Sequence, residues 1–205
     1  MPRPAVPSRR ADILLAARDV FSARGFSGTR MDDIARAVGI SKAALYLQFA
    51  SKEAMFEALV TELIERMLPQ AAPADFGDVP AAEILRRFTG FMADRLIQPE
   101  MAFVPRVIIG EGANFPELAR FYHDHVIARG MGIVERIMRH GVARGEFTCP
   151  DVAQAGRTLI GGMLIGAIWQ TVLVPAGAEP LDPAAMARAH ADTVLNGLLV
   201  RKDCA

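Results

Sequence analysis

The chain is poor in the residue types and motifs that mark enzymes and metalloproteins. Its 205 residues include two cysteines, Cys149 and Cys204, which match neither a disulfide framework nor a zinc-binding spacing. The sequence lacks a glycine-rich phosphate loop and an evident nucleophile–base pair. His123 and His125 stand two positions apart, so on a helix their side chains diverge and cannot share one metal ion. We therefore predict no catalytic site, no cofactor and no metal.

The chain also lacks a net charge and a secretory signal. Its first ten residues are basic and rich in proline but carry no apolar stretch, which favours a cytoplasmic protein. The 23 Lys and Arg equal the 23 Asp and Glu in number, but their distribution is uneven. Residues 1–52 hold nine basic and four acidic residues, and residues 53–205 hold 14 and 19. The positive charge is thus concentrated in the N-terminal quarter, which is consistent with a nucleic-acid partner.

That quarter contains the pattern of two short helices joined by a glycine turn. Thr29 is a candidate N-cap of the first helix, with Asp32 three residues later as in a capping box. Gly39 suits the left-handed residue that ends this helix, and Ser41 suits the cap of the next one. A capped helix, a short turn with glycine and a second capped helix describe a helix-turn-helix, the motif that reads DNA.

The outward face of the second helix supports this interpretation. If Leu45 points inward, Ala43 and Leu47 lie opposite to it and can touch thymine methyl groups. Gln48 can pair with adenine. An ordinary polar surface helix, the alternative, would rarely turn small and apolar side chains outward. The candidate DNA-binding residues on and around this helix are Arg30, Ser41, Lys42, Ala43, Ala44, Tyr46, Leu47, Gln48 and Lys52.

Residues 13–59 resemble the N-terminal domain of the TetR family of transcriptional regulators. The resemblance is carried by Ile13-Leu14, Ala16-Ala17, Phe21, Gly25-Phe26, Thr29, Asp33-Ile34-Ala35, Gly39-Ile40-Ser41-Lys42, Leu45-Tyr46, Phe49, Ser51-Lys52-Glu53 and Leu59. It implies an all-α homodimer with a three-helix head that binds double-stranded operator DNA, and a C-terminal domain that binds a small effector. It also implies DNA contacts at the residues above, apart from Ala44, and adds Thr29. At positions 47 and 48 the chain has Leu and Gln where the family often has an aromatic residue and His.

Helix signals continue through the rest of the chain and predict an all-α fold. We expect helices at 8–24, 80–97, 99–112, 116–144, 151–174 and 183–200, and a connecting helix that starts at Ser51. The stretch 69–80 contains three prolines and is predicted to be a loop. We divide the chain into a DNA-binding head at 1–50 and an effector-binding and dimerisation domain at 51–205.

Residues 158–174 form an uncharged apolar run that contains Gly162 and Gly166. A membrane span, a helix buried inside one protomer and a dimer helix all fit such a run. The run is short for a span and is interrupted by polar residues, so we favour the dimer helix and no membrane partner. Its glycines would let two copies, or a helix and its neighbour, approach closely. The predicted dimer contacts are Leu164, Ile168, Leu195 and Leu199.

Methionine and aromatic residues recur in the C-terminal part and suit an adaptable apolar pocket. For each of them an ordinary core position is the alternative. The candidate effector-binding residues are Phe88, Met92, Phe103, Val107, Glu111, Phe121, Tyr122, His125 and Trp169. An effector of this kind requires a cavity of roughly 300 Å³ or more. We predict a repressor that a small apolar or amphipathic effector releases from its operator; the alternative is an activator or an effector-independent DNA binder.

Overall fold

The regular structure of the protein is helical. The computed structural model describes residues 9–96 and 98–198, and within these ranges no β-strand occurs, which confirms the predicted all-α class. The predicted Leu199 lies outside the described residues.

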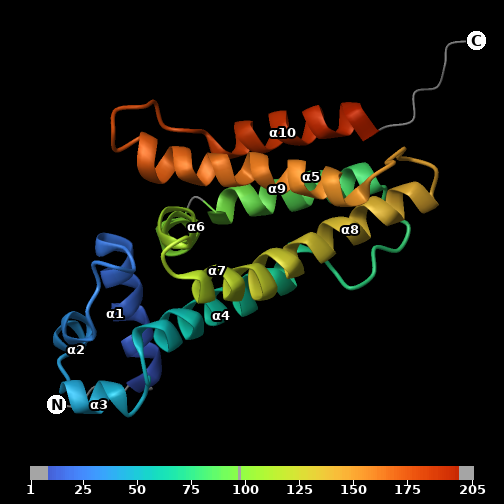
Figure 1. The fold of residues 1–205 in the computed structure, drawn as a ribbon. Coiled ribbons are helices and arrows are strands. Elements are labelled where there is room, and N and C mark those ends of the chain that lie inside the picture. Colours follow the sequence, from blue (N-terminus) through green and yellow to red (C-terminus); the bar gives the residue numbers. More distant parts are fainter. Residues whose placement is uncertain (1–8, 97, 199–205) are drawn as a thin grey trace, which may run out of the picture.

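Three helices form a small head at one end of the molecule (Figure 1). They are α1 (Arg9–Arg24), α2 (Met31–Val38) and α3 (Lys42–Tyr46). Gly39 ends α2 with a φ of 76°, in the left-handed region where a side chain on Cβ would be strained. The predicted turn between the two helices of the motif is therefore confirmed.

The long helix α4 (Lys52–Ala71) leads from the head into the body of the molecule (Figure 1). The body contains α5 (Ala81–Leu96), α8 (Ala128–Ala143), α9 (Val152–Ile168) and α10 (Pro183–Leu198). Between head and body lie α6 (Pro99–Glu111) and α7 (Pro116–Tyr122). The chain thus leaves the head through α4 and contacts it again through α6.

Three of the predicted segments differ from the structure in their division or in where they begin. The segment 116–144 is divided into α7, a π-helical turn at His123–Ile127 and α8, and 151–174 contains α9 followed by a π-helical turn at Trp169–Leu173. The predicted loop at 69–80 begins later, because α4 continues through Pro69 to Ala71. A π-turn adds one residue to a helical turn without breaking the helix, so helical periodicity in the sequence does not reveal it.

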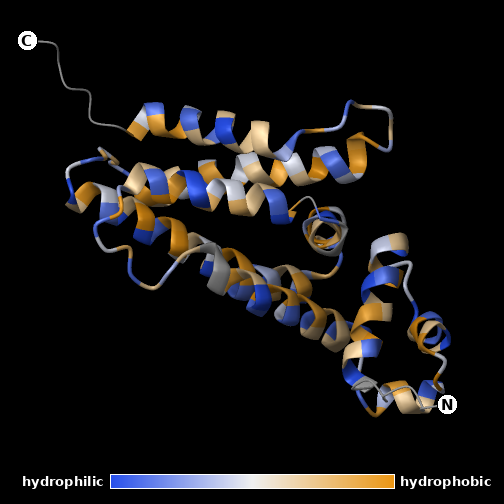
Figure 2. Ribbon diagram, turned by 180° about the vertical axis from the view of Figure 1, so that it is seen from behind, coloured by the Kyte–Doolittle hydropathy of each residue, from blue (hydrophilic) through white to orange (hydrophobic). Residues whose placement is uncertain are grey.

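The buried apolar residues form two clusters. The first joins α1–α4 to α6 and α7, and the second joins α5, α8, α9 and α10. Apolar residues follow the sides of the helices that face one another, as Figure 2 shows in orange. In the first cluster, Phe21, Phe26 and Phe56 pack with ring centroids 5.3–5.8 Å apart, and Phe26 also meets Phe115 of the body at 4.8 Å. Head and body therefore share one hydrophobic core.

The two glycines of the apolar run bring α9 close to α10 of the same chain. A Cβ at Gly162 would lie 2.3 Å from Cε1 of His190, and one at Gly166 would lie 2.5 Å from Sδ of Met186. His190 is fixed there by a 2.8 Å contact of Nε2 with the carbonyl oxygen of Leu159. The sequence allowed these glycines to bring together either two copies of the chain or two neighbouring helices. The structure shows the close approach of neighbouring helices.

Among the described residues, no helix combines the length and the hydropathy that a bilayer crossing demands.

Candidate nucleic-acid interface and apolar cavity

The helix α3 presents the surface predicted for DNA. Ser41 caps it, because its Oγ accepts a hydrogen bond from the amide of Ala44 at 3.1 Å. Leu45 is fully buried, whereas Leu47 is 85% and Tyr46 43% exposed. The remaining candidates Arg30, Ser41, Lys42, Ala43 and Gln48 are exposed, and Ala44 is half-buried. The capping serine and the buried leucine thus orient the predicted reading face toward solvent.

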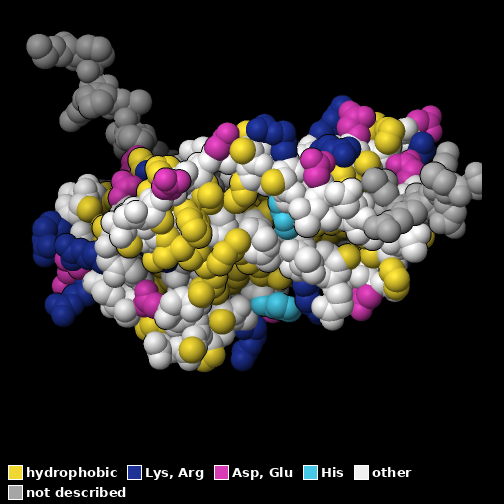
Figure 3. Space-filling view, turned by 90° about the horizontal axis from the view of Figure 1, so that it is seen from above, with side chains coloured by type: hydrophobic (Ala, Val, Ile, Leu, Met, Phe, Trp, Pro, Cys, Tyr) yellow, Lys and Arg dark blue, Asp and Glu magenta, His cyan; other side chains and the backbone are white. Residues whose placement is uncertain are grey.

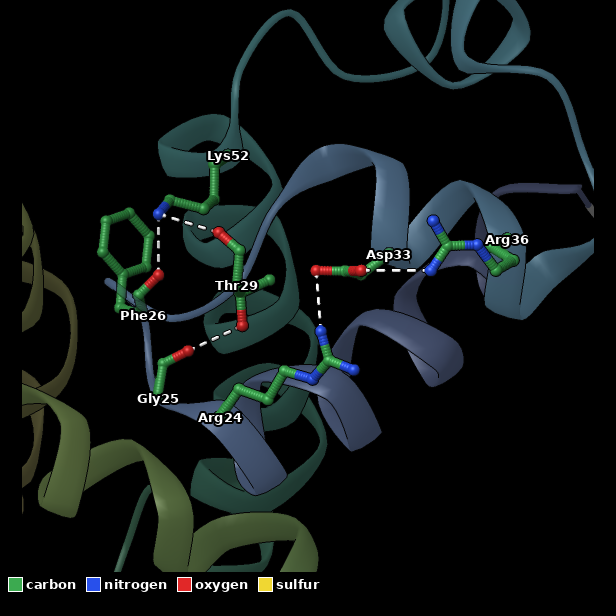
Figure 4. A network of polar contacts seen from close by, with 7 residues as sticks. All are labelled: Arg24, Gly25, Phe26, Thr29, Asp33, Arg36 and Lys52. Carbon is green, nitrogen blue, oxygen red and sulfur yellow. Dashed lines mark hydrogen bonds and ion pairs between the residues drawn. The ribbon is translucent and has the colours of Figure 1, made fainter.

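Thr29 does not belong to this exposed face. Its side chain is 1% exposed and donates a hydrogen bond from Oγ1 to the carbonyl oxygen of Gly25 at 2.6 Å (Figure 4). Arg30 occupies the N-cap position of α2 that the sequence pattern assigned to Thr29. Asp32, the predicted partner in the capping box, forms an ion pair with Lys42 at 2.9 Å instead. Thr29 therefore fastens the α1–α2 turn, and a DNA contact at this residue stays a prediction.

Lys52 is also bound inside the protein. Its Nζ donates to the carbonyl oxygens of Phe26 at 2.7 Å and Thr29 at 3.1 Å, as Figure 4 shows, and lies 4.3 Å from the centroid of the Phe26 ring. Desolvation by burial lowers the pKa of Lys52, against the opposing charges of Glu53 and Glu111. The ammonium group of Lys52 is thus held by two carbonyl oxygens of the head, and its contact with a DNA phosphate stays a prediction.

A second polar contact holds α2 against α1. The carboxylate of Asp33 forms ion pairs with Arg24 at 2.8 Å and Arg36 at 3.3 Å (Figure 4). Burial tends to raise the pKa of Asp33, but the charge of Arg24 and its hydrogen bond outweigh this effect and lower it. Charged groups thus join α1 to α2 in addition to the shared core.

A cleft of about 440 Å³ lies beside α3 where the first turns of α2 and α4 converge. Its lining includes Arg30, Lys42 and Tyr46, together with Ser51, which caps α4 by accepting from the amide of Ala54 at 3.1 Å. Helix N-termini carry partial positive charge and favour phosphate groups. The lining adds three cationic residues, Arg30, Lys42 and Lys52, and two acidic ones, Asp32 and Glu53, so positive groups outnumber negative ones at the edge of the predicted reading face.

An apolar cavity lies in the body among α4, α5, α6, α8 and α9. Four methionines line it, Met67, Met92, Met101 and Met163, and Tyr122 is the one residue of this lining with a polar side-chain group. The other lining residues are Val60, Leu63, Ile64, Leu68, Phe88, Leu96, Val104, Pro105, Val126, Ile127, Gly130, Ile160 and Leu164. The cavity volume is about 50 Å³. The expected volume of roughly 300 Å³ is thus not reached, because the methionine side chains fill the space between the helices.

Three of the predicted effector-binding residues line this cavity: Phe88, Met92 and Tyr122. Burial raises the pKa of Tyr122 to about 12. Phe103 and Val107 are instead buried in the core that α6 shares with the head. Sequence periodicity places all of these residues on inward helix faces, but it does not tell which inward face borders a cavity.

The other four predicted effector residues lie elsewhere. Phe121 and His125 stack on each other with centroids 4.4 Å apart, and the ring of His125 is exposed. Trp169 is 37% exposed, and its Nε1 donates to the carbonyl oxygen of Glu179 at 2.9 Å. The carboxylate of Glu111 accepts hydrogen bonds from backbone amides of the head. None of these four residues lines the apolar cavity, because each faces solvent or another part of the fold, and their contact with an effector stays a prediction.

An exposed apolar patch covers the face formed by α9 and α10, visible in yellow in Figure 3. Its most exposed members on α9 and the following π-turn are Ile165, Trp169, Val172 and Leu173. Of the predicted dimer contacts, Leu195 is 1% exposed in the protomer's own core, whereas Leu164, which also lines the cavity, and Ile168 are half-buried. Both sides of α9 are therefore apolar, and the dimer contacts expected from the sequence stay predictions.

The helix α6 fastens the head to the body. The Glu111 carboxylate accepts hydrogen bonds from the amides of Phe26 at 2.8 Å and Ser27 at 2.6 Å. Burial tends to raise the pKa of Glu111, but the hydrogen bonds from Ser27 and Phe26 and the charge of Lys52 outweigh it and lower the pKa. Arg106, one and a half turns earlier, donates to the carbonyl oxygen of Ser22. All three hydrogen bonds join residues more than eighty positions apart, so no local sequence signal predicts them.

Two family models match the chain. Residues 13–59 match the model of bacterial regulatory proteins of the tetR family, and residues 83–198 match the C-terminal domain of AefR-like transcriptional repressors. The second match alone spans more than half of the chain.

Individual proteins that resemble this chain in sequence or structure are also transcriptional regulators. The HTH-type transcriptional regulator UidR of Escherichia coli is 30% identical over 151 residues, which cover 71% of this chain and 72% of UidR. The HTH-type transcriptional regulator RutR of the same organism is 39% identical over 79 residues, which cover 38% of this chain and 37% of RutR. The crystal structure of the TetR-family regulator PfmR from Thermus thermophilus superposes with a TM-score of 0.71 at 29% identity, over 90% of this chain and 97% of PfmR.

Proposed function

The chain belongs to the TetR family of bacterial regulatory proteins and is a helix-turn-helix transcriptional regulator, and we propose that it is a repressor which a small apolar or amphipathic molecule releases from its operator. Its site of action is then the cytoplasm, where its DNA partner lies. Two protomers would read a near-palindromic site, with half-sites about one helical turn, ~34–36 Å, apart.

The dimer would form through the apolar patch on α9 and α10. Ile165 is 59% exposed at its centre, next to Trp169 and Val172 one and two turns further along. Exposed apolar side chains clustered on one face of a protein usually mark an interaction surface. A two-fold contact through this patch would leave both heads free to meet the same face of the DNA.

The course of α6 is the observation that carries the proposed effector response. Met101, Val104 and Pro105 in its first half line the cavity, while Arg106 and Glu111 in its second half hold the head. A ligand that enters a cavity of about 50 Å³ must widen it, and the adjoining helices must move. Because α6 is attached to the head at both residues, a displacement of α6 would turn the head and change the spacing of the two reading helices.

The test begins with selection of bound duplexes from random DNA, which should yield a sequence with dyad symmetry. Operator affinity is then measured with and without a panel of apolar compounds. An effective ligand should weaken DNA binding by ~5- to 150-fold, and DNA should weaken ligand binding by the same factor. Leu164→Trp should fill the cavity and abolish the ligand response without loss of DNA binding, and Val142→Trp, at an exposed position of α8, serves as the matched control.

In vitro transcription from the selected operator decides the sign of regulation. Repression relieved by ligand supports the proposal. Stimulation of transcription would support the activator alternative, and repression that no member of the panel relieves would support the effector-independent DNA binder. Bound sequences without a dyad would contradict the two-fold model.

A further inference from the structure

A second, polar space lies directly outside the apolar cavity. It has a volume of about 450 Å³ and is lined by Arg18, Leu63, Arg66, Met67, Arg95, Gln98 and Met101. Leu63, Met67 and Met101 also line the cavity, so these three side chains form a wall that both spaces share. Two of the three are methionines, whose unbranched side chains turn aside at low cost. The two spaces are therefore halves of one site that a rotation of Met67 or Met101 would join.

The charged residues that line the outer space are all positive. Its three charged residues are arginines from three different helices: Arg18 on α1, Arg66 on α4 and Arg95 on α5. Arg18 is paired with Asp19 at 2.8 Å and Arg66 with Glu62, whereas Arg95 lies over the ring of Phe91 at 5.4 Å and takes part in no ion pair within residues 9–96 and 98–198. The neighbouring α6 begins at Pro99 and adds the positive field of its N-terminus.

We propose that the joined site binds an amphipathic anion: a linear alkyl chain in the cavity and an acidic headgroup on the arginines. This inference rests on the proposed function and specifies the chemical class of its effector. The lining of the inner space suits a hydrocarbon, since Tyr122 alone in that lining has a polar side-chain group. A thin, flexible chain enters between methionines with less displacement than a fused ring system. Guanidinium groups are the preferred partners of carboxylates and phosphates.

Arg18 gives this headgroup a direct connection to the DNA-binding end. It lies on α1 of the head, whereas Arg66 and Arg95 lie on the body. An anion held between them would pull α1 toward α5. A neutral ligand of the same length would fill the cavity but would exert no such pull, so the acid should be both the tighter ligand and the stronger effector.

Calorimetric titration with three ligands of equal chain length tests the inference. Decanoate, decanol and decylamine carry an anionic, a neutral and a cationic headgroup on the same alkyl chain. Decanoate should bind about 5- to 10-fold more tightly than decanol, and decylamine most weakly. Added salt should weaken the binding of decanoate and leave that of decanol unchanged, because only the former depends on charge.

Arg95→Gln should lower the affinity for decanoate by about 5-fold and leave that for decanol unaltered. Arg87→Gln is the matched control: it lies exposed on the same helix, pairs with Glu83, and should change neither affinity. Decanoyl-coenzyme A separates the two sources of the anion. Tighter binding than that of decanoate identifies the phosphates of the coenzyme as the headgroup, and weaker binding identifies the free carboxylate.

Equal affinities for decanoate and decanol in the unaltered protein would overturn the inference. Decanol binding would then still support an apolar effector, so the proposed function would stand. Failure of all three alkyl ligands to bind would overturn the inference as well. The proposed function would still stand in that case if another apolar compound released the protein from DNA.

Discussion

The carboxylate of Glu111 accepts a hydrogen bond from the amide of Ser27 at 2.6 Å and thereby joins the end of α6 to the turn between α1 and α2. The same carboxylate lies so close to Gly25 that a Cβ at this position would be 2.5 Å from Oε1. Gly25 has a φ of 70°, which strains any other residue as well. The turn is therefore shaped to receive this one side chain from the body.

Glu111→Gln should weaken the attachment of the head to the body. The amide side chain still accepts a hydrogen bond but carries no charge, so the free energy of unfolding should fall by about 1–2 kcal/mol at neutral pH. Because the folded pKa of Glu111 lies below its ordinary value of 4.5, the carboxylate stabilises the fold above that pH, and this contribution is lost as the pH falls through the folded pKa. Denaturant titrations at several pH values should show the two proteins converging in acid. A constant difference at all pH values would contradict the role of the charge.

Alkaline titration should reveal the buried phenol of Tyr122. Burial raises its pKa from 10.0 to about 12, so the unfolded chain releases this proton first as the pH rises. The fold should thus lose about 2–3 kcal/mol of stability between these two pH values. The measurement is the ultraviolet difference spectrum together with denaturant unfolding. Tyr122→Phe should remove both the late phenolate signal and this loss of stability; a variant that still shows them would assign them to another group.

Gly162→Ala should destabilise the protein by about 1–3 kcal/mol, because its methyl group would collide with the imidazole of His190. Gly132→Ala is the control. A Cβ at this exposed position of α8 has open space around it, so the exchange should stabilise the helix by up to about 1 kcal/mol. Chemical denaturation of both variants measures the difference. Equal effects would show that helix propensity alone governs these positions.

Ile165→Arg should convert the proposed dimer into monomers. A desolvated charge at the centre of an apolar contact has no partner, and obligate dimers of this kind usually bury more than ~2,000 Å². Sedimentation velocity at micromolar concentration measures the state of association. Leu15→Arg, at an exposed apolar position of the head, should leave the dimer intact. A monomeric unaltered protein under these conditions would contradict the model.

Gln48→Ala should change which bases the protein prefers, whereas Arg30→Gln should weaken binding to all sequences alike. The first side chain is placed to reach base edges and the second to reach phosphates beside the cleft. Binding measured over a range of salt concentrations should show a slope reduced by about 1 for Arg30→Gln and unchanged for Gln48→Ala. An altered base preference in the Arg30 variant would reverse the assignment of these two roles.

The sequence by itself determined the features that depend on neighbours in the chain. Ser41 caps its helix as predicted, and Ser51 caps the connecting helix that was expected to start there. Asp182 caps α10 in the same way and accepts hydrogen bonds from the amides of Ala184 at 2.9 Å and Ala185 at 3.1 Å. The left-handed Gly39 was equally predictable, because it bonds within its own turn. Such contacts span three or four residues, so residue type and spacing locate most of them, although the capping box expected at Thr29 and Asp32 does not form.

Only the tertiary structure decided which side of an apolar helix meets which neighbour. The faces of α9 that contain Leu164 and Ile165 are both apolar, and packing against α4, α5, α6 and α8 turned the former to the cavity and left the latter exposed. Thr29 and Lys52 are residue types that suit DNA contacts, but in the folded head both donate hydrogen bonds to backbone carbonyl oxygens. The bond from Glu111 to Ser27 and the row of arginines outside the cavity arise from distant parts of the chain. Periodicity shows which residues face inward, and the mutual arrangement of the helices determines what they meet there.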